Sequence, residues 1–598
     1  MSRERIYEDL TLVQRRANVV FWIFAGLLLL TLSYYWKVQI LEHKKYLGMA
    51  EANRIRMREL AAPRGLILDR AGGKLADNRA SFKVSLNREN VKNESVSYPA
   101  ICRLLGIDEP TLRNRIALHK DLPSHEPVVI ADGLTPEDVA PIESRRLELP
   151  ELVVESEPQR YYPGGGLAAH VVGYVQELTA EEIRARPDRK VRGGEMLGRT
   201  GVERQYDDIL RGQDGIAYDV VDSLGRFQGE QSRQYPLKGR DITLTIDPAL
   251  QAEAVKSLEG REGVIVALDA ETGGVLALAS YPTFDPNRFI TRFTPAEWSQ
   301  LTTDPLSPLE NRAIRGLYAP GSIFKLVMSL GGLDGGFVTP ETTVFCSGAT
   351  EIYGSVRHCW FAPGHGAMDL AAAIRNSCNI YFYSLGRRMG IEPIAAAARR
   401  LGLGRRTGID LVGEKEGLVP DTEWKSKTFH APWFPGETIS VAIGQGQLQV
   451  TPIQIAAMTA LIARRGRPVQ PHLLGGRDEP KTPDAPSPVY ALTSFESVIE
   501  GMWRSVNEGG TGAQARVEGF EACGKTGSTQ TISREAAERL ALAGHPVKTH
   551  SWFSGFAPRV GPKIVVTVLV EFGGGGGATS GPIAGRLFEI YKKELESR

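Results

Sequence analysis

An uncharged run of amino acids near the N-terminus constrains the fold of this chain more than any other feature. The run extends from Ala17 to Trp36 and contains no Asp, Glu, Lys or Arg. About twenty apolar residues in a helix match the hydrocarbon thickness of a bilayer. Trp22, Tyr34 and Tyr35 lie near its ends, where aromatic side chains favour the membrane interface. The sequence therefore predicts a single membrane-spanning helix over residues 17–36, preceded by a short cytoplasmic tail over residues 1–16.

A cleaved signal peptide is the alternative for this segment. The apolar run is long for a signal peptide, and no pair of small residues typical of a cleavage site follows it. The flanking charges decide the orientation less clearly, because Arg15 and Arg16 flank one side, whereas Lys37, Lys44 and Lys45 flank the other. The positive-inside rule leans toward an N-terminus in the cytoplasm.

The length of the chain requires more than one domain. Its 598 residues exceed the usual size of a single hydrophobic core. Charged residues (24%) and hydrophobic residues (42%) occur in the proportions of an ordinary globular protein. The net charge is +1, and no basic stretch is interleaved with aromatic residues, so no nucleic-acid partner is expected.

Ser322 and Lys325 offer a nucleophile and a candidate base one helical turn apart. Pro320 and Gly321 precede them as a helix start, and an apolar run follows. Residues i and i+3 share one face of a helix, so the hydroxyl and the amine can meet. A lysine can activate a serine when burial lowers its pKa and leaves it uncharged. Alone, S-x-x-K is common, and an exposed serine beside a solvated lysine is its more frequent explanation.

Two further motifs follow in the order used by penicillin-binding proteins and serine β-lactamases. An S-x-N motif at residues 377–379 comes after a predicted helix over residues 370–376. A K-T-G motif at residues 525–527 opens a strand-like run rich in Ser and Thr. With three motifs in this order, the chain resembles a class B penicillin-binding protein of the elongation type, a D,D-transpeptidase that cross-links peptidoglycan.

The resemblance covers nearly the whole chain. Segments similar to motifs of the non-catalytic domain of class B proteins lie at residues 64–70, 160–174 and 198–206. Segments similar to motifs of the catalytic domain lie at residues 243–247, 264–277, 420–425, 443–446 and 451–452. The last three of these are also typical of turns and helix caps that hold a fold together.

The resemblance implies an α/β (α+β) fold. A transpeptidase domain like that of penicillin-binding proteins and serine β-lactamases is expected over residues 239–598. An elongated non-catalytic pedestal of the dimerisation type is expected over residues 37–238. We expect this pedestal to begin with helix to about residue 60 and to contain an inserted lobe at residues 81–156.

Within the catalytic domain, the sequence also predicts individual elements. Alternating apolar residues around Gly273 and Gly274 predict a β-hairpin. Residues 563–570 are predicted as the last strand and residues 582–596 as a closing helix. The glycine run between them, residues 573–577, is expected to be a flexible turn.

The resemblance assigns roles to the first two motifs. Ser322 is expected to attack the penultimate D-Ala of a stem peptide, to release the terminal D-Ala and to form an acyl-enzyme. Lys325 is the expected base, although the identity of the base differs among these enzymes. Ser377 and Asn379 are expected to relay protons and to orient the lysine. Neither a nucleotide nor an organic cofactor is needed, because an ester carries the energy of one amide bond to another.

The third motif is expected to bind the substrate. Lys525 adds positive charge that disfavours protonation of the catalytic lysine and attracts the substrate carboxylate. Thr526 and Ser528 are expected to donate hydrogen bonds to that carboxylate; the family often has Thr in place of Ser528. Gly527 is expected to leave room for a peptide along the strand edge. By resemblance, the backbone N–H groups of Ser322 and Ser528 form the oxyanion hole.

The cysteines predict a metal site. Cys346, Cys359, His365 and Cys378 offer three thiolates and an imidazole, which is a ligand set of structural zinc. The resemblance supports this prediction, because elongation-type members carry zinc in this region. A disulfide between Cys346 and Cys359 is one alternative, and free buried thiols are another. His358 is a rival ligand to His365.

The remaining cysteines, Cys102 and Cys523, are expected to be small buried residues.

Two other functions compete with transpeptidation. A D,D-carboxypeptidase or a β-lactamase would pass the acyl group to water, and an allosteric scaffold would activate a glycosyltransferase without catalysis. Expected partners are peptidoglycan stem peptides and their lipid-linked precursor, β-lactams, a SEDS-type membrane glycosyltransferase and other proteins of the elongation complex. The expected location is the inner membrane, with the catalytic domain in the periplasm.

Overall fold

The computed structural model describes residues 10–117, 127–178, 182, 195–222, 227–291, 293–476, 489–529 and 549–597. Contacts between residues divide the chain into two compact units. The first unit combines residues 1–62, 80–157 and 213–237, and the second combines residues 63–79, 158–212 and 238–598.

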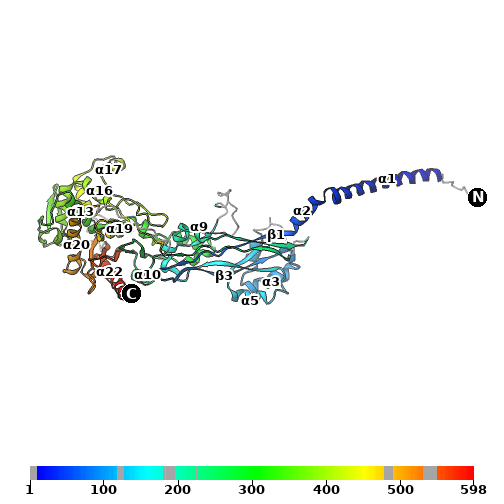
Figure 1. Cartoon of the computed structure of the whole chain (residues 1–598), viewed down its shortest axis with the longest axis horizontal. Coiled ribbons are helices and arrows are strands. Elements are labelled where there is room, and N and C mark those ends of the chain that lie inside the picture. The colour runs from blue at the N-terminus through cyan, green and yellow to red at the C-terminus, as the bar shows by residue number, and fades with distance from the viewer. Residues whose placement is uncertain are drawn as a thin grey trace, which may run out of the picture. The chain divides into compact units, whose positions relative to one another are not determined.

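A long apolar helix opens the first unit (Figure 1). Helix α1 (Leu10–Trp36) continues through a π-helical turn (Lys37–Leu41) to α2 (His43–Arg54). Within the described residues, Thr11–Leu41 is the one helical segment long and apolar enough to cross a membrane, and its side chains are not buried against the protein. The helix begins earlier than expected, at Leu10. The expected helix to about residue 60 is wrong at its end, where β1 (Ile55–Leu60) replaces it.

Two groups of strands complete the first unit. Strand β8 (Gly215–Val221) lies between β1 and β9 (Phe227–Gln234), and both pairings are antiparallel. The second group consists of β3 (Lys74–Leu86), β4 (Val128–Leu134) and β5 (Leu152–Tyr161); the start of β3 and the end of β5 belong to the second unit.

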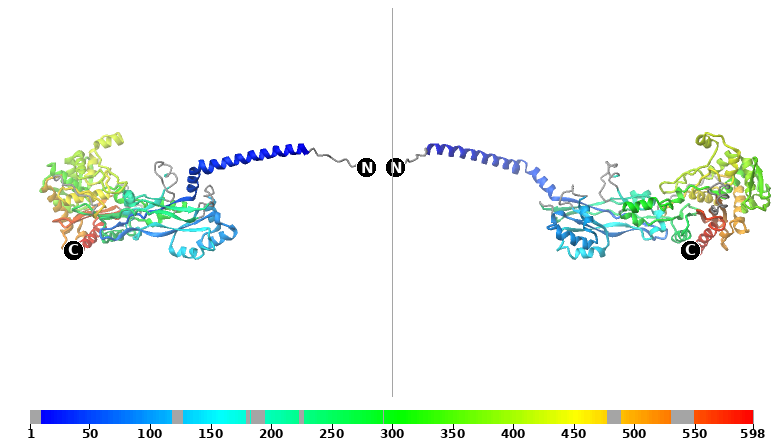
Figure 2. Two further views of the ribbon diagram at one scale, coloured as in Figure 1. Left: turned by 45° about the vertical axis from the view of Figure 1, so that its right-hand side comes forward. Right: turned by 180° about the vertical axis from the view of Figure 1, so that it is seen from behind.

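The segment expected as an inserted lobe, residues 81–156, has a core of its own. Helices α3 (Glu94–Leu105), α4 (Glu109–Ala117) and α5 (Pro136–Glu143) gather on one side of β3 and β4 (Figure 2). Apolar side chains from both the helices and the strands form this core: Val84, Ile101, Leu112, Ile130 and Ile142.

A five-stranded sheet organises the second unit. Its order is β12-β11-β19-β18-β17, and all neighbouring strands are antiparallel. The strands are β11 (Gly263–Asp269), β12 (Val275–Tyr281), β17 (Cys523–Thr529), β18 (His550–Ala557) and β19 (Ile564–Val570). The predicted hairpin around Gly273 and Gly274 is therefore present, as is the predicted last strand. Strand β17 lies at the edge of the sheet, and no other described strand pairs with its outer side.

Both faces of this sheet are covered, because successive side chains of a strand point to opposite faces. Val264 and Val266 of β11 join the larger core, whereas Ile265 joins a second core with Leu587 and Phe588 of the C-terminal helix. The helices of this part of the chain include α10 (Pro248–Leu258), α11 (Pro295–Thr302), α12 (Arg312–Arg315), α13 (Lys325–Asp334), α14 (Leu370–Arg375), α15 (Asn379–Met389), α16 (Ile391–Arg400), α17 (Thr422–Phe429), α18 (Pro435–Val441), α19 (Pro452–Ala463), α20 (Leu492–Asn507) and α22 (Ser580–Ser597).

The packing divides the chain differently from the boundary expected at residue 238. Residues 63–79 and 158–212, which lie within the expected pedestal, group with residues 238–598. Ile67 and Val202 share one apolar core with Leu244. The boundary in the sequence is therefore not the boundary in space, because these apolar side chains are buried together with the first strands of the catalytic domain.

Buried ion pairs join the same segments. Glu203 is fully buried and accepts hydrogen bonds from Arg160 (2.6 Å) and Arg64 (2.8 Å). Arg64 also donates to Asp207 (2.9 Å). Arg64, Arg160 and Glu203 come from the three segments that resemble motifs of the non-catalytic domain, so these motifs form one buried charge network.

Candidate active site

Ser322 lies in a tight turn directly before a helix. The turn, η5 (Gly321–Phe324), has 3-10 geometry, and helix α13 begins at Lys325. Ser322 is half-buried, whereas Lys325 is completely buried. The sequence correctly placed this motif at a helix start, but the serine itself belongs to the preceding turn.

A glycine brings the serine turn against β17. Gly321 has a φ of +56°, which is in the left-handed region that favours glycine. A Cβ at this position would lie 2.5 Å from Cγ2 of Thr529 and 3.1 Å from the carbonyl oxygen of Ser528. The Gly321 N–H also donates to the carbonyl of Gly444 (2.9 Å). The I-G-Q-G segment at residues 443–446 thus supports the turn, as expected for a motif that holds a fold.

The amine of Lys325 contacts the second motif directly. Its Nζ donates to the carbonyl of Ser377 (2.8 Å), to Oδ1 of Asn379 (2.7 Å) and to Oγ of Ser377 (3.2 Å). No carboxylate among the described residues forms an ion pair with it. Burial therefore lowers the pKa of Lys325 to about 7.

Ser377 has an unusual backbone conformation. Its φ is +53°, although it is not a glycine. Such a conformation costs on the order of 1 kcal/mol, and strained residues of this kind are common at functional sites. The strained residue lies between α14 and α15, where it turns its carbonyl and its hydroxyl toward Lys325.

Lys525 of the third motif is also completely buried. Its Nζ donates to the carbonyl of Thr526 (3.0 Å), and no carboxylate among the described residues pairs with it. Burial, with a further contribution from the nearby Lys325, holds the pKa of Lys525 well below its usual value. We expected Lys525 to lower the pKa of Lys325, but the principal cause of that shift is the burial of Lys325 itself.

Gly527 of the third motif lies close to the serine turn. A Cβ at Gly527 would lie 3.0 Å from the carbonyl oxygen of Pro320 and 3.4 Å from Ile323. The missing side chain lets β17 approach the serine turn, and its role in leaving room for a peptide at the strand edge stays a prediction.

The hydroxyl groups expected to bind the carboxylate already have partners. Thr526 donates to Oγ1 of Thr511 (2.8 Å), and the N–H of Gly576 donates to Oγ of Ser528 (3.1 Å). The sequence analysis identified neither Thr511 nor Gly576 as part of the site. Both lie in glycine-rich runs that indicate loops, and a loop signal does not reveal which strand the loop contacts.

The glycine run at residues 573–577 lies in a turn, as expected, and part of it packs against the neighbouring strands. Thr549 donates to the carbonyl of Gly574 (2.9 Å). A Cβ at Gly576 would lie 2.4 Å from the carbonyl oxygen of Trp552 and 2.5 Å from that of Gly527. The glycines therefore allow this loop to contact the backbone of β17 and β18.

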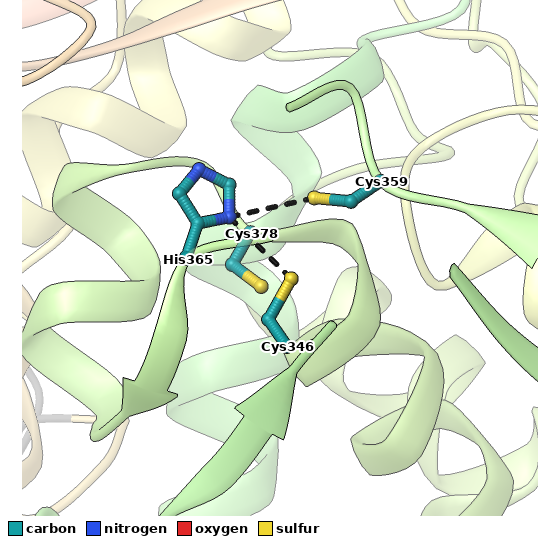
Figure 3. A group of neighbouring side chains, drawn as sticks. All are labelled: Cys346, Cys359, His365 and Cys378. Atoms are coloured by element: carbon teal, nitrogen blue, oxygen red, sulfur yellow. Dashed lines mark hydrogen bonds between the residues drawn. The ribbon is translucent and has the colours of Figure 1, made fainter. Parts of the chain in front are cut away.

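The four residues expected to bind zinc lie together (Figure 3). Cys346, Cys359, His365 and Cys378 each offer a ligand atom, and these atoms all lie within 4.8 Å of one another. Nδ1 of His365 is 3.6 Å from the sulfur atoms of both Cys346 and Cys359. His358 is not part of the group; its carbonyl accepts a bond from Asn379 (3.5 Å).

All five cysteines are free, so Cys346 and Cys359 are not joined by a disulfide. A hydrogen bond from the Cys378 thiol lowers the pKa of Cys359, and the same bond together with burial raises that of Cys378. Cys523 is buried in β17, as expected, whereas Cys102 is only partly buried.

Two family models match this chain. The model described as the penicillin binding protein transpeptidase domain matches residues 263–589, and that of the penicillin-binding protein dimerisation domain matches residues 59–244. The peptidoglycan D,D-transpeptidase MrdA of Acinetobacter baumannii is 34% identical over 574 residues, which cover 94% of this chain and 85% of the relative.

Solved structures are also similar to this chain over most of its length. A chain from the complex between PBP2 and MreC of Helicobacter pylori has a TM-score of 0.79 at 29% identity and covers 91% of this chain and 99% of that chain. A chain from a peptidoglycan synthase complex that coordinates polymerization and crosslinking has a TM-score of 0.72 at 32% identity and covers 96% and 98%. This chain therefore belongs to the family of penicillin-binding proteins with a transpeptidase domain, together with the relatives named peptidoglycan D,D-transpeptidase MrdA.

Proposed function

We propose that this chain is a peptidoglycan D,D-transpeptidase that works through an acyl-enzyme on Ser322. The observation that carries this proposal is the environment of Lys325. Its amine is completely buried, has no carboxylate partner among the described residues and bonds to both polar residues of the S-x-N motif. Such an amine is poised to be neutral near pH 7, as a base for a serine must be.

The hydrogen bonds of Lys325 suggest how the proton moves. A neutral amine has two N–H groups and one lone pair. The two shorter bonds, to the Ser377 carbonyl and to Asn379, use the two N–H groups. The lone pair is then available to take the proton of Ser322, directly or through the hydroxyl of Ser377 at 3.2 Å.

The acylation of Ser322 takes place where the serine turn lies against strand β17. Ser322 attacks the carbonyl of the penultimate D-Ala, the terminal D-Ala leaves with a proton, and an ester to the serine remains. The close approach of the turn to β17 at Ser528 supports an oxyanion hole formed by the backbone N–H groups of Ser322 and Ser528. An amine of a second stem peptide attacks the ester, which forms the cross-link and releases the enzyme.

Mass spectrometry of a penicillin adduct tests the nucleophile. We expect one equivalent of penicillin on a peptide that contains Ser322, and none in Ser322→Ala. An adduct on any other residue would refute the assignment. Digestion of the product made from lipid-linked precursor distinguishes the reactions: cross-linked dimers support transpeptidation, whereas trimmed monomers alone favour a D,D-carboxypeptidase. A strain that grows normally with Ser322→Ala would favour the scaffold role.

We further propose that Cys346, Cys359, His365 and Cys378 bind a structural zinc ion. Three thiols and an imidazole within 4.8 Å of one another fit this metal, because tetrahedral zinc with Zn–S bonds of about 2.3 Å brings its ligands to within about 4 Å. When bound, zinc would supply a cross-link between residues 346–365 and the helix that carries Asn379. Cys378 lies between Ser377 and Asn379, which both contact Lys325, so the proposed metal site is adjacent to the S-x-N motif.

Metal analysis of the purified full chain tests this second proposal. We expect about one zinc per chain, with loss of the metal in Cys346→Ser. Protein without zinc, in which peptide mapping finds Cys346 and Cys359 paired, would show that the site is a disulfide.

We also propose that α1 anchors the chain in the inner membrane, with the catalytic domain in the periplasm. The apolar helix and the membership in the family support this orientation. The similar structures contain MreC in one case and a peptidoglycan synthase complex in the other, which supports a partner in the elongation complex, including a SEDS-type glycosyltransferase. Protease accessibility in spheroplasts tests the orientation: the catalytic domain should be cleaved from outside.

A further inference from the structure

Thr511 connects two catalytic motifs that are far apart in the sequence. It lies in a glycine-rich loop after α20 and is half-buried. Its Oγ1 accepts the hydrogen bond of Thr526 in the K-T-G motif, at 2.8 Å. Its backbone N–H donates to the carbonyl of Arg375 at 3.2 Å, and its own hydroxyl is 3.5 Å from the same carbonyl. Arg375 ends α14, two residues before Ser377 of the S-x-N motif.

The loop is held in this position by several contacts. The guanidinium of Arg375 donates to the carbonyl of Glu508, and the N–H of Gly512 donates to the carbonyl of Ser505 (3.0 Å). A Cβ at Gly510 would lie 2.8 Å from the Arg375 carbonyl, so the backbone of the loop lies directly on the end of α14. The Thr511 hydroxyl is therefore fixed relative to both motifs.

The direction of the bond between Thr511 and Thr526 decides what Thr526 can offer to a ligand. A threonine hydroxyl has one proton to donate and two lone pairs. In the observed arrangement Thr526 donates its proton to Thr511, so it presents only lone pairs elsewhere. A carboxylate only accepts hydrogen bonds, so it requires that proton.

Thr511 can reverse this arrangement. If its hydroxyl turns from the Arg375 carbonyl and donates to Thr526, the proton of Thr526 becomes free for the ligand. The 2.8 Å separation between the oxygens suits a bond in either direction. A valine has the same shape but can neither accept nor donate, so Thr526 would lose both its alignment and this polarisation.

We propose that Thr511 is a positioning residue that aims the Thr526 hydroxyl at the terminal carboxylate of the donor peptide. This inference rests on the proposed role of Thr526 as a carboxylate donor. Besides the hydroxyls of Thr526 and Ser528, a third hydroxyl, that of Thr511 in a separate loop, would then contribute to the preference of the enzyme for a peptide with a free C-terminal carboxylate.

Kinetics with two matched donors test the proposal. The full chain and its Thr511→Val, Thr511→Ser and Thr526→Val variants are assayed with a D-Ala-D-Ala peptide and with the same peptide ending in a carboxamide. We expect Thr511→Val to lower kcat/KM for the carboxylate donor about tenfold, the usual effect of losing one hydrogen bond to a charged group. The carboxamide donor should change less than about twofold, and Thr511→Ser should retain most of the activity.

Each other outcome has a definite meaning. An unchanged kcat/KM in Thr511→Val, or an equal loss for both donors, would overturn the role of Thr511. Equal losses for both donors in Thr526→Val would instead refute the carboxylate role of Thr526, which separates the two hypotheses. If Thr511→Val is poorly folded, Thr511→Ala and its double variant with Thr526→Val decide: the proposal requires that Thr511→Ala lower kcat/KM for the carboxylate donor and that the double variant show no loss beyond that of Thr526→Val. Thr302→Val, in an exposed helix where the hydroxyl donates to the Trp298 carbonyl (2.8 Å), is the matched control.

Discussion

Two buried clusters of charged residues in the second unit follow opposite rules. In the network that joins residues 63–79 to residues 158–212, buried Glu203 is paired with Arg160 and Arg64. In the catalytic site, the buried amines of Lys325 and Lys525 bond only to neutral oxygen atoms among the described residues.

The difference between the clusters appears in their pKa values. Burial acts against the charge of Glu203, but the two guanidinium groups outweigh it and hold the pKa of Glu203 below its usual value. For Lys325 nothing of comparable strength opposes burial, and its pKa falls to about 7. A buried charge that is paired keeps its charge and is costly to leave without its partner, whereas an unpaired buried amine loses its charge near neutral pH and can act as a base.

Removing the unpaired amine should have the largest effect on chemistry. We expect Lys325→Ala to lower the rate of acylation by a fluorescent penicillin at least about 10³-fold, because the general base is lost. The melting temperature should change little, since no ion pair is broken. Circular dichroism of the same sample provides the control, and normal labelling of Lys325→Ala would reject this lysine as the base.

Removing the paired charge should have the opposite effect. Glu203→Gln leaves Arg64 and Arg160 without their shared carboxylate, so we expect the free energy of unfolding to fall by about 3–5 kcal/mol. The acylation rate per folded molecule should be retained. Glu155→Gln is the matched control, because its pair with Lys83 is partly exposed and should contribute less than about 1 kcal/mol. Denaturant unfolding measures the free energy of unfolding of both variants. An equal decrease in Glu203→Gln and Glu155→Gln would show that the buried pair is no more important for stability than the partly exposed one.

The glycine loop at residues 573–577 offers a third case beside the paired and the unpaired buried charges, because it supports strand β17 through backbone contacts and carries no charge. Gly576→Ala should cost about 1–3 kcal/mol and reduce acylation, since its Cβ would meet the backbone of Trp552 and Gly527. Gly575→Ala should be silent, because no atom lies within 4 Å of the Cβ it adds. Thermal unfolding and penicillin labelling measure both variants, and similar behaviour of the two would show that this contact is not maintained.

The pH dependence of acylation should show the smallest effect. The active form of Lys325 is neutral, and its fraction rises as pH rises through about 7. We expect the acylation rate to increase about tenfold per pH unit below pH 6 and to level off above pH 8. Stopped-flow measurements with a chromogenic β-lactam provide the profile. A rate that is flat from pH 5 to pH 8 would indicate that Lys325 is not the titrating base.

Several parts of the fold could be predicted because local patterns determine them. The uncharged run determines the helix α1, and short apolar runs determine the strands β11, β12 and β19. The family resemblance predicted that Ser377 and Asn379 orient Lys325, which bonds to both, and the donor types predicted the cluster of Cys346 and its partners. The predicted end of the first helical region, at about residue 60, was wrong. From Ile55 onward the chain forms strand β1, because it pairs with β8 in the tertiary structure.

The amino-acid sequence by itself determined the family, the order of the three motifs and the membrane-length helix, because each depends on residues that are close together in the chain. The tertiary structure alone decided which loops complete the site. Thr511 reaches Thr526 and Gly576 reaches Ser528 through hydrogen bonds across chain segments that carry no pattern of their own. It also decided the reactivity of Lys325, because a pKa depends on the burial and the charges that surround a side chain in space.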